Sequence, residues 1–128
     1  MAEIRDDLKY TKEHEWLKIE GNIATEGITD YAQSELSDIV MLELPEVGKE
    51  IKAGDAVGTI EAVKAVSDLY AGLSGKIIAI NEEAVADPSI LNKDPYGKGW
   101  LYKIELKDAN EIETLLTPEE YKKLIAEH

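Results

Sequence analysis

The sequence contains no cysteine and no phenylalanine among its 128 residues. Without cysteine, neither a disulfide framework nor a thiolate metal site can form, which is compatible with a reducing compartment. Without phenylalanine, the core has to be built from Val, Ile, Leu, Ala, Tyr and the two Trp residues. A chain of this length corresponds to about one domain, so we expect one domain over residues 1–128.

Long apolar runs are also missing. No stretch approaches the ~20 apolar residues that a membrane-spanning helix needs. The segment Met1–Asp7 lacks the basic and apolar regions of a signal peptide, and it is too acidic for a transit peptide. These absences predict a protein of the (prokaryotic) cytoplasm without a membrane partner.

Positive charge is scarce, with 14 basic residues against 27 acidic ones and a formal net charge of -13. Phosphate backbones repel such a surface, so nucleic acid is not expected as a partner. The charge has two interpretations. It can simply maintain solubility, or it can steer the protein toward basic docking clefts on partner enzymes, where fast encounter matters more than tight contact.

Short strands separated by turn residues dominate the pattern. Residues 8–28 are expected to form a hairpin around Gly21-Asn22, and Thr29 is expected to cap a short helix to Leu36. Residues 81–99 are polar and contain two prolines, which indicates a long loop with a helical turn near Pro88. Thr117-Pro118-Glu119-Glu120 has the residues of a capping box and begins a C-terminal helix. The pattern favours a β-sandwich or a closed barrel.

The stretch Ile60–Asp68 places a single lysine between two small apolar pairs, Ala62-Val63 and Ala65-Val66. Strand-like residues lie on both sides, so a hairpin over residues 56–70 is expected with Lys64 at its tip. Val63 and Lys64 suit a type I turn better than a primed turn, which requires φ > 0. An amine at this position stays in water on a flexible stem. The pattern indicates an attachment point rather than a catalyst.

Glu61-Ala62-Val63-Lys64-Ala65, followed by Ser67-Asp68, resembles the lipoyl-lysine motif of the glycine cleavage system H protein family. Further matches run in family order along nearly the whole chain: Tyr10-Thr11, His14-Glu15-Trp16, Gly27 to Gln33, Glu43-Leu44-Pro45, Asp94-Pro95-Tyr96 and Gly99-Trp100. The resemblance implies a mainly β, barrel-sandwich hybrid fold of the lipoyl- and biotinyl-carrier type. It also implies an N-terminal hairpin, a short helix near residues 30–36 and a C-terminal helix.

The resemblance implies a carrier and not an enzyme, with lipoate covalently attached to Lys64. Such a carrier takes an aminomethyl group from the pyridoxal-phosphate glycine decarboxylase (P protein) and presents it to the tetrahydrofolate-dependent aminomethyltransferase (T protein). Dihydrolipoamide dehydrogenase (L protein) then reoxidises it. A lipoate ligase or lipoyl transferase is a further expected partner, and the carrier is expected to be a monomer with no metal site.

In the family, the loaded arm folds back into a surface cleft lined by acids, and the matching residues here are Glu15 and Asp68. A cationic amine would be held there by charge-assisted hydrogen bonds. A third cleft residue of the family is a small hydroxyl before the histidine, which is Glu13 in this chain. Ala62 replaces the usual serine beside the lysine. The first departure adds an acid to the expected cleft, and the second lies next to the attachment site itself.

Three alternatives remain open at this point. A biotin carrier usually has Ala-Met-Lys-Met around its lysine, whereas Lys64 lies between Val63 and Ala65. An H-like lipoyl donor that relays lipoate to 2-oxo-acid dehydrogenase domains would have the same motif. A hydrolase built on Glu15 and Asp68 lacks a nucleophile motif. His14 is expected to be a structural residue beside Trp16, since one histidine cannot build a metal site.

Overall fold

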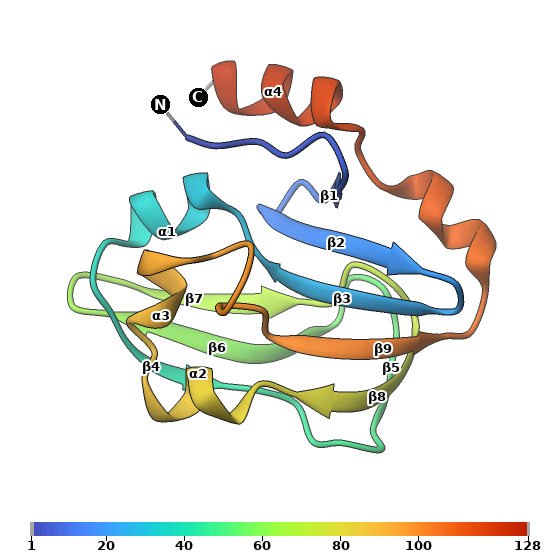
Figure 1. Ribbon diagram of the computed structural model, residues 1–128, viewed down its shortest axis with the longest axis horizontal. Helices are drawn as coiled ribbons and strands as arrows, with labels where there is room; N and C mark the ends of the chain where they lie inside the picture. Colours follow the sequence, from blue (N-terminus) through green and yellow to red (C-terminus); the bar gives the residue numbers. More distant parts are fainter. Residues whose placement is uncertain (1, 128) are drawn as a thin grey trace.

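Two antiparallel β-sheets form the body of the structure, a computed structural model that describes residues 2–127 (Figure 1). The large sheet has the strand order β1-β2-β3-β9-β8-β5, and the small sheet has the order β4-β6-β7. The strands are β1 (Lys9–Tyr10), β2 (Glu15–Glu20), β3 (Ile23–Ile28), β4 (Ile39–Glu43), β5 (Glu50–Ile51), β6 (Ala56–Ala62), β7 (Val66–Tyr70), β8 (Gly75–Ile80) and β9 (Tyr102–Leu106).

Apolar side chains from the facing surfaces of the two sheets make the main core. Leu17, Ile60, Leu69, Ile77 and Ile104 are among its fully buried members. As the lack of phenylalanine requires, aliphatic residues fill this core and Tyr102 is its large aromatic member. Burial of such side chains contributes roughly 1.5–3 kcal/mol each relative to exposure.

A second apolar cluster covers the other face of the large sheet. Trp16 lies directly opposite Gly27 on β3, where a side chain would clash with the indole ring at 2.5 Å. Helix α4 (Pro118–Ala126) lies over this face (Figure 1) and buries Tyr121 against Tyr10 in a parallel ring stack with centroids 4.6 Å apart. The apolar helix face predicted from the sequence, which includes Leu124, packs on this cluster.

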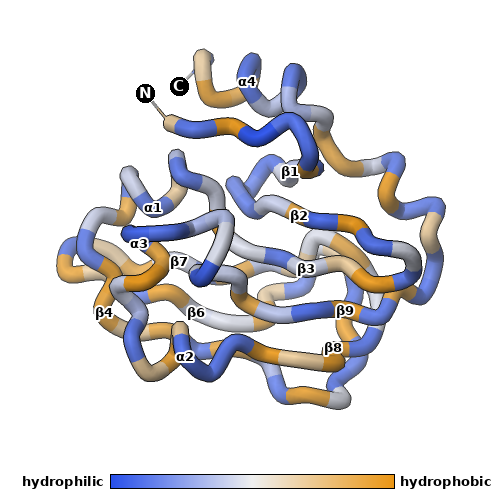
Figure 2. The backbone as a smooth tube through the Cα atoms, in the orientation of Figure 1, coloured by the Kyte–Doolittle hydropathy of each residue, from blue (hydrophilic) through white to orange (hydrophobic). Residues whose placement is uncertain are grey.

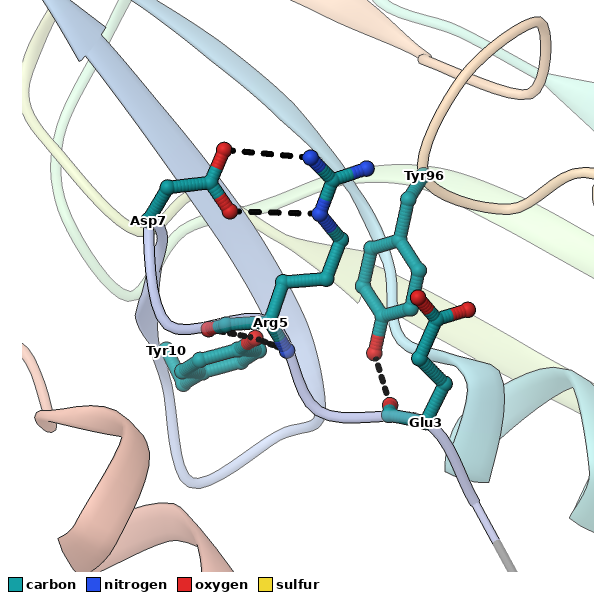
Figure 3. Close-up of polar contacts among 5 residues, drawn as sticks. All are labelled: Glu3, Arg5, Asp7, Tyr10 and Tyr96. Atoms are coloured by element: carbon teal, nitrogen blue, oxygen red, sulfur yellow. Dashed lines mark hydrogen bonds and ion pairs between the residues drawn. The ribbon is translucent and has the colours of Figure 1, made fainter.

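An N-terminal segment, residues 3–7, is held across the same face by tyrosine hydroxyls (Figure 3). The Tyr10 hydroxyl accepts from the Arg5 amide and donates to the Arg5 carbonyl, while Tyr96 donates to the Glu3 carbonyl. Arg5 also pairs with Asp7. Apart from that ion pair, these contacts use backbone atoms of the segment. They therefore fix the path of the segment whatever its side chains are.

The helices begin where the sequence predicts N-caps. Thr29 caps α1 (Asp30–Leu36), and the Thr117–Glu120 capping box is complete at the start of α4. The predicted loop over residues 81–99 contains two short helices on either side of Pro88, α2 (Glu82–Ala86) and α3 (Ile90–Lys93), and a 3₁₀ helix η1 (Ala109–Thr114) precedes α4.

The predicted fold class is confirmed: the two sheets pack as an open sandwich with an N-terminal hairpin, a short helix at 30–36 and a C-terminal helix. The sheets are not closed into a barrel, which suits the barrel-sandwich hybrid description. Within residues 2–127, no helix has the length and hydropathy required to cross a membrane.

Candidate functional site

Lys64 lies at the tip of the β6–β7 hairpin, in the turn from Ala62 to Ala65. The Ala62 amide donates to the Ala65 carbonyl at 2.7 Å, which closes the turn. The Val63 amide donates to the backbone carbonyl of Asp38, the residue before β4, at 2.9 Å. Among the described residues that are not glycine, only His14 and Ser37 have positive φ. The turn is therefore not of a primed type, as the sequence predicts.

The side chain of Lys64 is exposed, and within residues 2–127 it makes no hydrogen bond or ion pair. Val63 and Val66 beside it are 69% and 65% exposed, so the hairpin presents an apolar tip (Figure 2). An amine on a flexible stem, with small or apolar neighbours, can enter an enzyme's active site and accept an acyl group. The tip thus suits covalent attachment of a carboxylic acid cofactor.

Glu15 begins β2 and is only 2% exposed. It faces the main core because it shares the inward side of the strand with Leu17. The Thr11 hydroxyl donates to one carboxylate oxygen at 2.6 Å, and the Tyr70 amide donates to the other at 3.2 Å. The second bond joins the large sheet to β7, the strand that returns from Lys64.

Burial raises the pKa of Glu15 to about 7, and the negative charge of Glu13 adds to the shift, although the hydrogen bonds from Thr11 and Tyr70 oppose it. Both ion pairs found in residues 2–127 lie elsewhere, at Arg5–Asp7 and Glu119–Lys122. Glu15 therefore has no cationic partner among the described residues, and it is an acid whose charge changes near neutral pH.

Glu26 is a second buried acid, which the sequence analysis missed. It lies opposite Leu17 and Tyr102 in the large sheet and is fully buried. One carboxylate oxygen accepts from the Gly72 amide at 2.8 Å, while Oε2 and the Tyr102 hydroxyl have no partner among the described residues. Burial, together with the charge of Glu15, raises the pKa of Glu26 well above its usual range. Ala24, Glu26 and Ile28 lie two positions apart and so share one face of β3. This period of two in the sequence could have indicated that Glu26 is buried.

Glu15 and Glu26, both on the large sheet, together bind the backbone at the end of β7. Their carboxylates accept hydrogen bonds from the amides of Tyr70, the last residue of β7, and of Gly72, two residues further on. A side chain at Gly72 would approach Leu17 to 2.7 Å, so only glycine allows this close contact. The base of the hairpin is consequently fixed, while its tip is exposed.

The other two predicted acids, Glu13 and Asp68, are exposed. Asp68 lies on the outward side of β7, where the Tyr70 hydroxyl donates to it at 3.5 Å. The charges of Asp68, Glu13 and Glu15, with Asp68 the strongest, all contribute to a raised pKa of Tyr70. Tyr70, which the sequence analysis did not select, thus lies among the three predicted acids.

Two surface pockets include Glu13. The seam pocket, about 440 Å³, lies between the turn before β2 and the end of β7 and is lined by Thr11, Lys12, Glu15 and Tyr70 as well. The helix-side pocket, about 260 Å³, lies against α1. Its lining residues are Glu13, His14, Tyr31, Ala32, Glu35, Leu36 and Ser67. The structure therefore brings Glu13 and Glu15 to one pocket, while Asp68 lines neither.

An open sandwich of two antiparallel sheets, with an unpaired lysine at an exposed hairpin tip, defines a carrier of the barrel-sandwich class. The family model described as Glycine cleavage H-protein matches residues 8–128. The glycine cleavage system H protein of Carboxydothermus hydrogenoformans is 54% identical over 127 residues, which cover 99% of this chain and 98% of that protein.

Two further relatives agree. A probable glycine cleavage system H protein of Aeropyrum pernix is 52% identical over 118 residues, 92% of this chain and 82% of its own length. The crystal structure of a glycine cleavage system H protein from Mycobacterium marinum superposes with a TM-score of 0.89 at 41% identity, covering 96% of this chain and 99% of that one.

The chain belongs to the glycine cleavage H-protein family. It is accordingly a lipoyl carrier of the glycine cleavage system and not an enzyme, as the motifs around Lys64 predict.

Proposed function

We propose that Lys64 carries lipoate in amide linkage and that the chain moves an aminomethyl group from glycine decarboxylase to the aminomethyltransferase before dihydrolipoamide dehydrogenase reoxidises it. The observation that supports this most directly is the exposed, unpaired Lys64 side chain at the hairpin tip, taken over residues 2–127. When bound, lipoate supplies a dithiolane that accepts the cargo and exchanges electrons. The chain itself supplies reach, shelter and recognition.

The acids near Tyr70 are suited to hold a cationic amine. Glu13 lines both pockets, Glu15 lines the seam pocket, and Asp68 is the strongest of the charges that act on Tyr70. Because these acids have no ion-pair partner in residues 2–127, an arriving ammonium group would compensate existing negative charge. A cation beside Glu15 would also lower the pKa of that buried carboxyl, so binding would release a proton near neutral pH.

The helix-side pocket is the better shelter for the end of the arm. Ser67, one of its lining residues, is three positions beyond Lys64 on β7. Ala32 and Leu36 give it an apolar wall from α1, which reduces access of water to a labile linkage. Glu13, which lines both pockets, supplies a carboxylate to either position.

Attachment of lipoate requires a lipoate ligase or a lipoyl transferase, and we propose that the chain meets this enzyme and the P, T and L proteins as a monomer in the cytoplasm. The apolar tip around Val63 and Val66 can enter a partner's cleft, while the acidic surface favours basic surroundings. All of these encounters would use the same hairpin, so they would exclude one another in time.

Reconstitution with the three partner enzymes tests this role. With lipoylated wild-type protein, glycine-dependent methylene transfer to tetrahydrofolate is expected. Lys64→Arg, treated identically, should give none, because it has no acylable amine at position 64. Lys76→Arg, at the exposed position of β8, should retain full transfer. Transfer through Lys64→Arg at the wild-type rate would reject the assignment.

The shelter is tested by the rate at which loaded protein loses its cargo to water. One charge-assisted hydrogen bond is worth roughly 1.5–3 kcal/mol, so Glu13→Gln or Asp68→Asn should speed this loss by about ten- to a hundredfold. Glu43→Gln is a matched control, since Glu43 is an exposed acid two strands away from Asp68 in the small sheet. Equal rates in Glu13→Gln, Asp68→Asn, the double variant Glu13→Gln with Glu15→Gln, and the control would show that the acids do not hold the cargo.

A further inference from the structure

The hydroxyl of Tyr121 makes two hydrogen bonds at the end of the β2–β3 hairpin. Its partners are His14 Nδ1 at 2.9 Å and the Thr29 hydroxyl at 2.7 Å. Tyr121 belongs to α4 near the C-terminus, and both it and Thr29 are fully buried. One phenolic oxygen thus connects the C-terminal helix to two segments that are distant from it in sequence.

Both segments include or lead into residues that line the helix-side pocket, and we call these two sets of lining residues its walls. His14 lines it from the 11–15 turn. Thr29 is the N-cap of α1, whose Tyr31, Ala32 and Leu36 form the other wall. The Thr29 amide also donates to the His14 carbonyl at 3.0 Å, so the walls meet at their base, directly at the Tyr121 hydroxyl.

The His14 wall needs support because its backbone is strained. His14 has φ of 67°, in the left-handed region that residues with a side chain rarely adopt. Such a conformation persists only where surrounding contacts determine it. The imidazole packs against the Tyr31 and Tyr121 rings, with centroids 4.9 Å and 5.7 Å away, and its bond to the Tyr121 hydroxyl adds a directional contact.

We propose that Tyr121 is a positioning residue that fixes the two walls of the helix-side pocket relative to each other and so determines how well the pocket retains the cargo. The inference rests on the proposed function, because retention matters only if the pocket shelters the arm. Tyr121 touches neither Lys64 nor the acids directly in any contact found in residues 2–127; it acts through His14, next to Glu13 and Glu15, and through the start of α1.

Tyr121→Phe tests the inference, since it removes the hydroxyl and keeps the ring stacked on Tyr10. Tyr10→Phe is the matched control. Tyr10 is the other ring of the same stack, and its hydroxyl binds Arg5, on the N-terminal segment, and interacts with Tyr96 (Figure 3). Both variants lose two hydrogen bonds of a buried tyrosine, but only Tyr121→Phe releases the walls. Near-ultraviolet circular dichroism would confirm that each variant is folded.

Amide hydrogen exchange in the protein without lipoate gives the first measurement. The amides of Thr29, Ala32 and Gln33, which depend on the His14–Thr29 base and the N-cap, should exchange about tenfold faster in Tyr121→Phe, equivalent to about 1.4 kcal/mol of local stability. The ring nitrogen signal of His14 should shift in the same variant. In Tyr10→Phe, both should match the wild type.

The loaded protein gives the second measurement, for which cargo loss should be about tenfold faster in Tyr121→Phe and unchanged in Tyr10→Phe. His14→Gly, with a residue that tolerates positive φ, removes the contact from the other side and should act like Tyr121→Phe. The inference is overturned if the wall amides exchange at the wild-type rate, if Tyr10→Phe loosens them equally, or if looser walls retain the cargo normally. In that last case wild-type protein is still loaded at Lys64, whereas failure of the proposed function would leave it unloaded.

Discussion

At the scale of single residues, the site is defined by acids that form no ion pair within residues 2–127. Glu15 and Glu26 are buried, yet they accept hydrogen bonds only from hydroxyl or amide donors of the chain, and Glu26 Oε2 has no donor within residues 2–127. Burying a carboxyl in this way favours its neutral form, and each charge opposes the other. The folded protein therefore stores unfavourable electrostatic energy next to the place where a cationic cargo is proposed to bind.

This energy gives Glu15 a measurable effect on stability. Its folded pKa of about 7 lies above the ordinary value of 4.5, so the folded state binds the proton more tightly than the unfolded chain between those pH values. The free energy of unfolding should thus fall as the pH rises through this window, by on the order of 3 kcal/mol for this one group.

Glu15→Gln should remove that contribution, because the amide stays neutral and can still accept from the Tyr70 amide. Urea unfolding between pH 5 and pH 8 checks this. The variant should gain stability relative to wild type as the pH rises, while Glu43→Gln, at an exposed position whose charge does not contribute to the raised pKa of Glu15, should follow the wild-type curve. If the curves of Glu15→Gln and wild type run parallel over the window, Glu15 does not titrate there.

At the scale of elements, local sequence patterns correctly predicted the turns and helix caps, which depend on contacts between neighbouring residues. The β2–β3 hairpin around Gly21, the cap at Thr29 and the capping box at Thr117 depend on residues a few positions apart, and all three are present. The exposed hairpin tip at Lys64 is also where the sequence places it. The helices α2 and α3 were expected only as one turn, because Pro88 interrupts their pattern.

The rest could not be predicted because it depends on distant contacts. Glu15 binds the Tyr70 amide across 55 positions, and Glu26 binds the Gly72 amide across 46. The alternation in β3 indicates that Glu26 shares a face with apolar residues, but not that an amide is available there. The Tyr121 contact with His14 spans 107 positions. These contacts exist only once the two sheets and α4 have packed together.

The capping box of α4 gives a prediction at this scale. The Thr117 hydroxyl accepts from the Glu120 amide at 3.2 Å, and the Glu120 side chain accepts from the Thr117 amide at 2.9 Å. Thr117→Ala should lower the free energy of unfolding by about 1 kcal/mol, whereas Thr117→Ser should retain most of it. Urea unfolding of the three proteins measures the difference. A loss of equal size in both variants would show that the hydroxyl is not what matters.

For the whole molecule, the net charge of -13 is the dominant property. Folding brings Asp68 and Glu43 to the exposed small sheet that carries the hairpin, so the negative charge extends to the docking end of the molecule. The screening length in solution is about 8 Å at physiological salt and is longer at low salt, so the charge acts over a greater distance there. A carrier with several successive partners gains from rapid encounter more than from strong binding.

Association with each partner enzyme should consequently depend on ionic strength. Stopped-flow measurements from low to physiological salt should show a clear fall in the association rate and a smaller change in the dissociation rate. As the control, an uncharged solute that changes the viscosity is added at constant salt, so that diffusion changes while the screening of charge does not. An association rate that does not respond to salt would leave solubility as the only role of the charge.

The central claim is that Lys64 is the attachment site for lipoate, and intact-mass measurement after incubation with a lipoate ligase, ATP and lipoate tests it most directly. Wild-type protein should gain the mass of a single lipoyl group, with fragment ions placing it on the peptide that contains Lys64. Lys64→Arg should gain nothing, although the exposed turn tolerates the substitution, and Lys76→Arg should be modified like the wild type. A lipoyl group on the Lys64→Arg protein, or none on the wild type, would contradict the account.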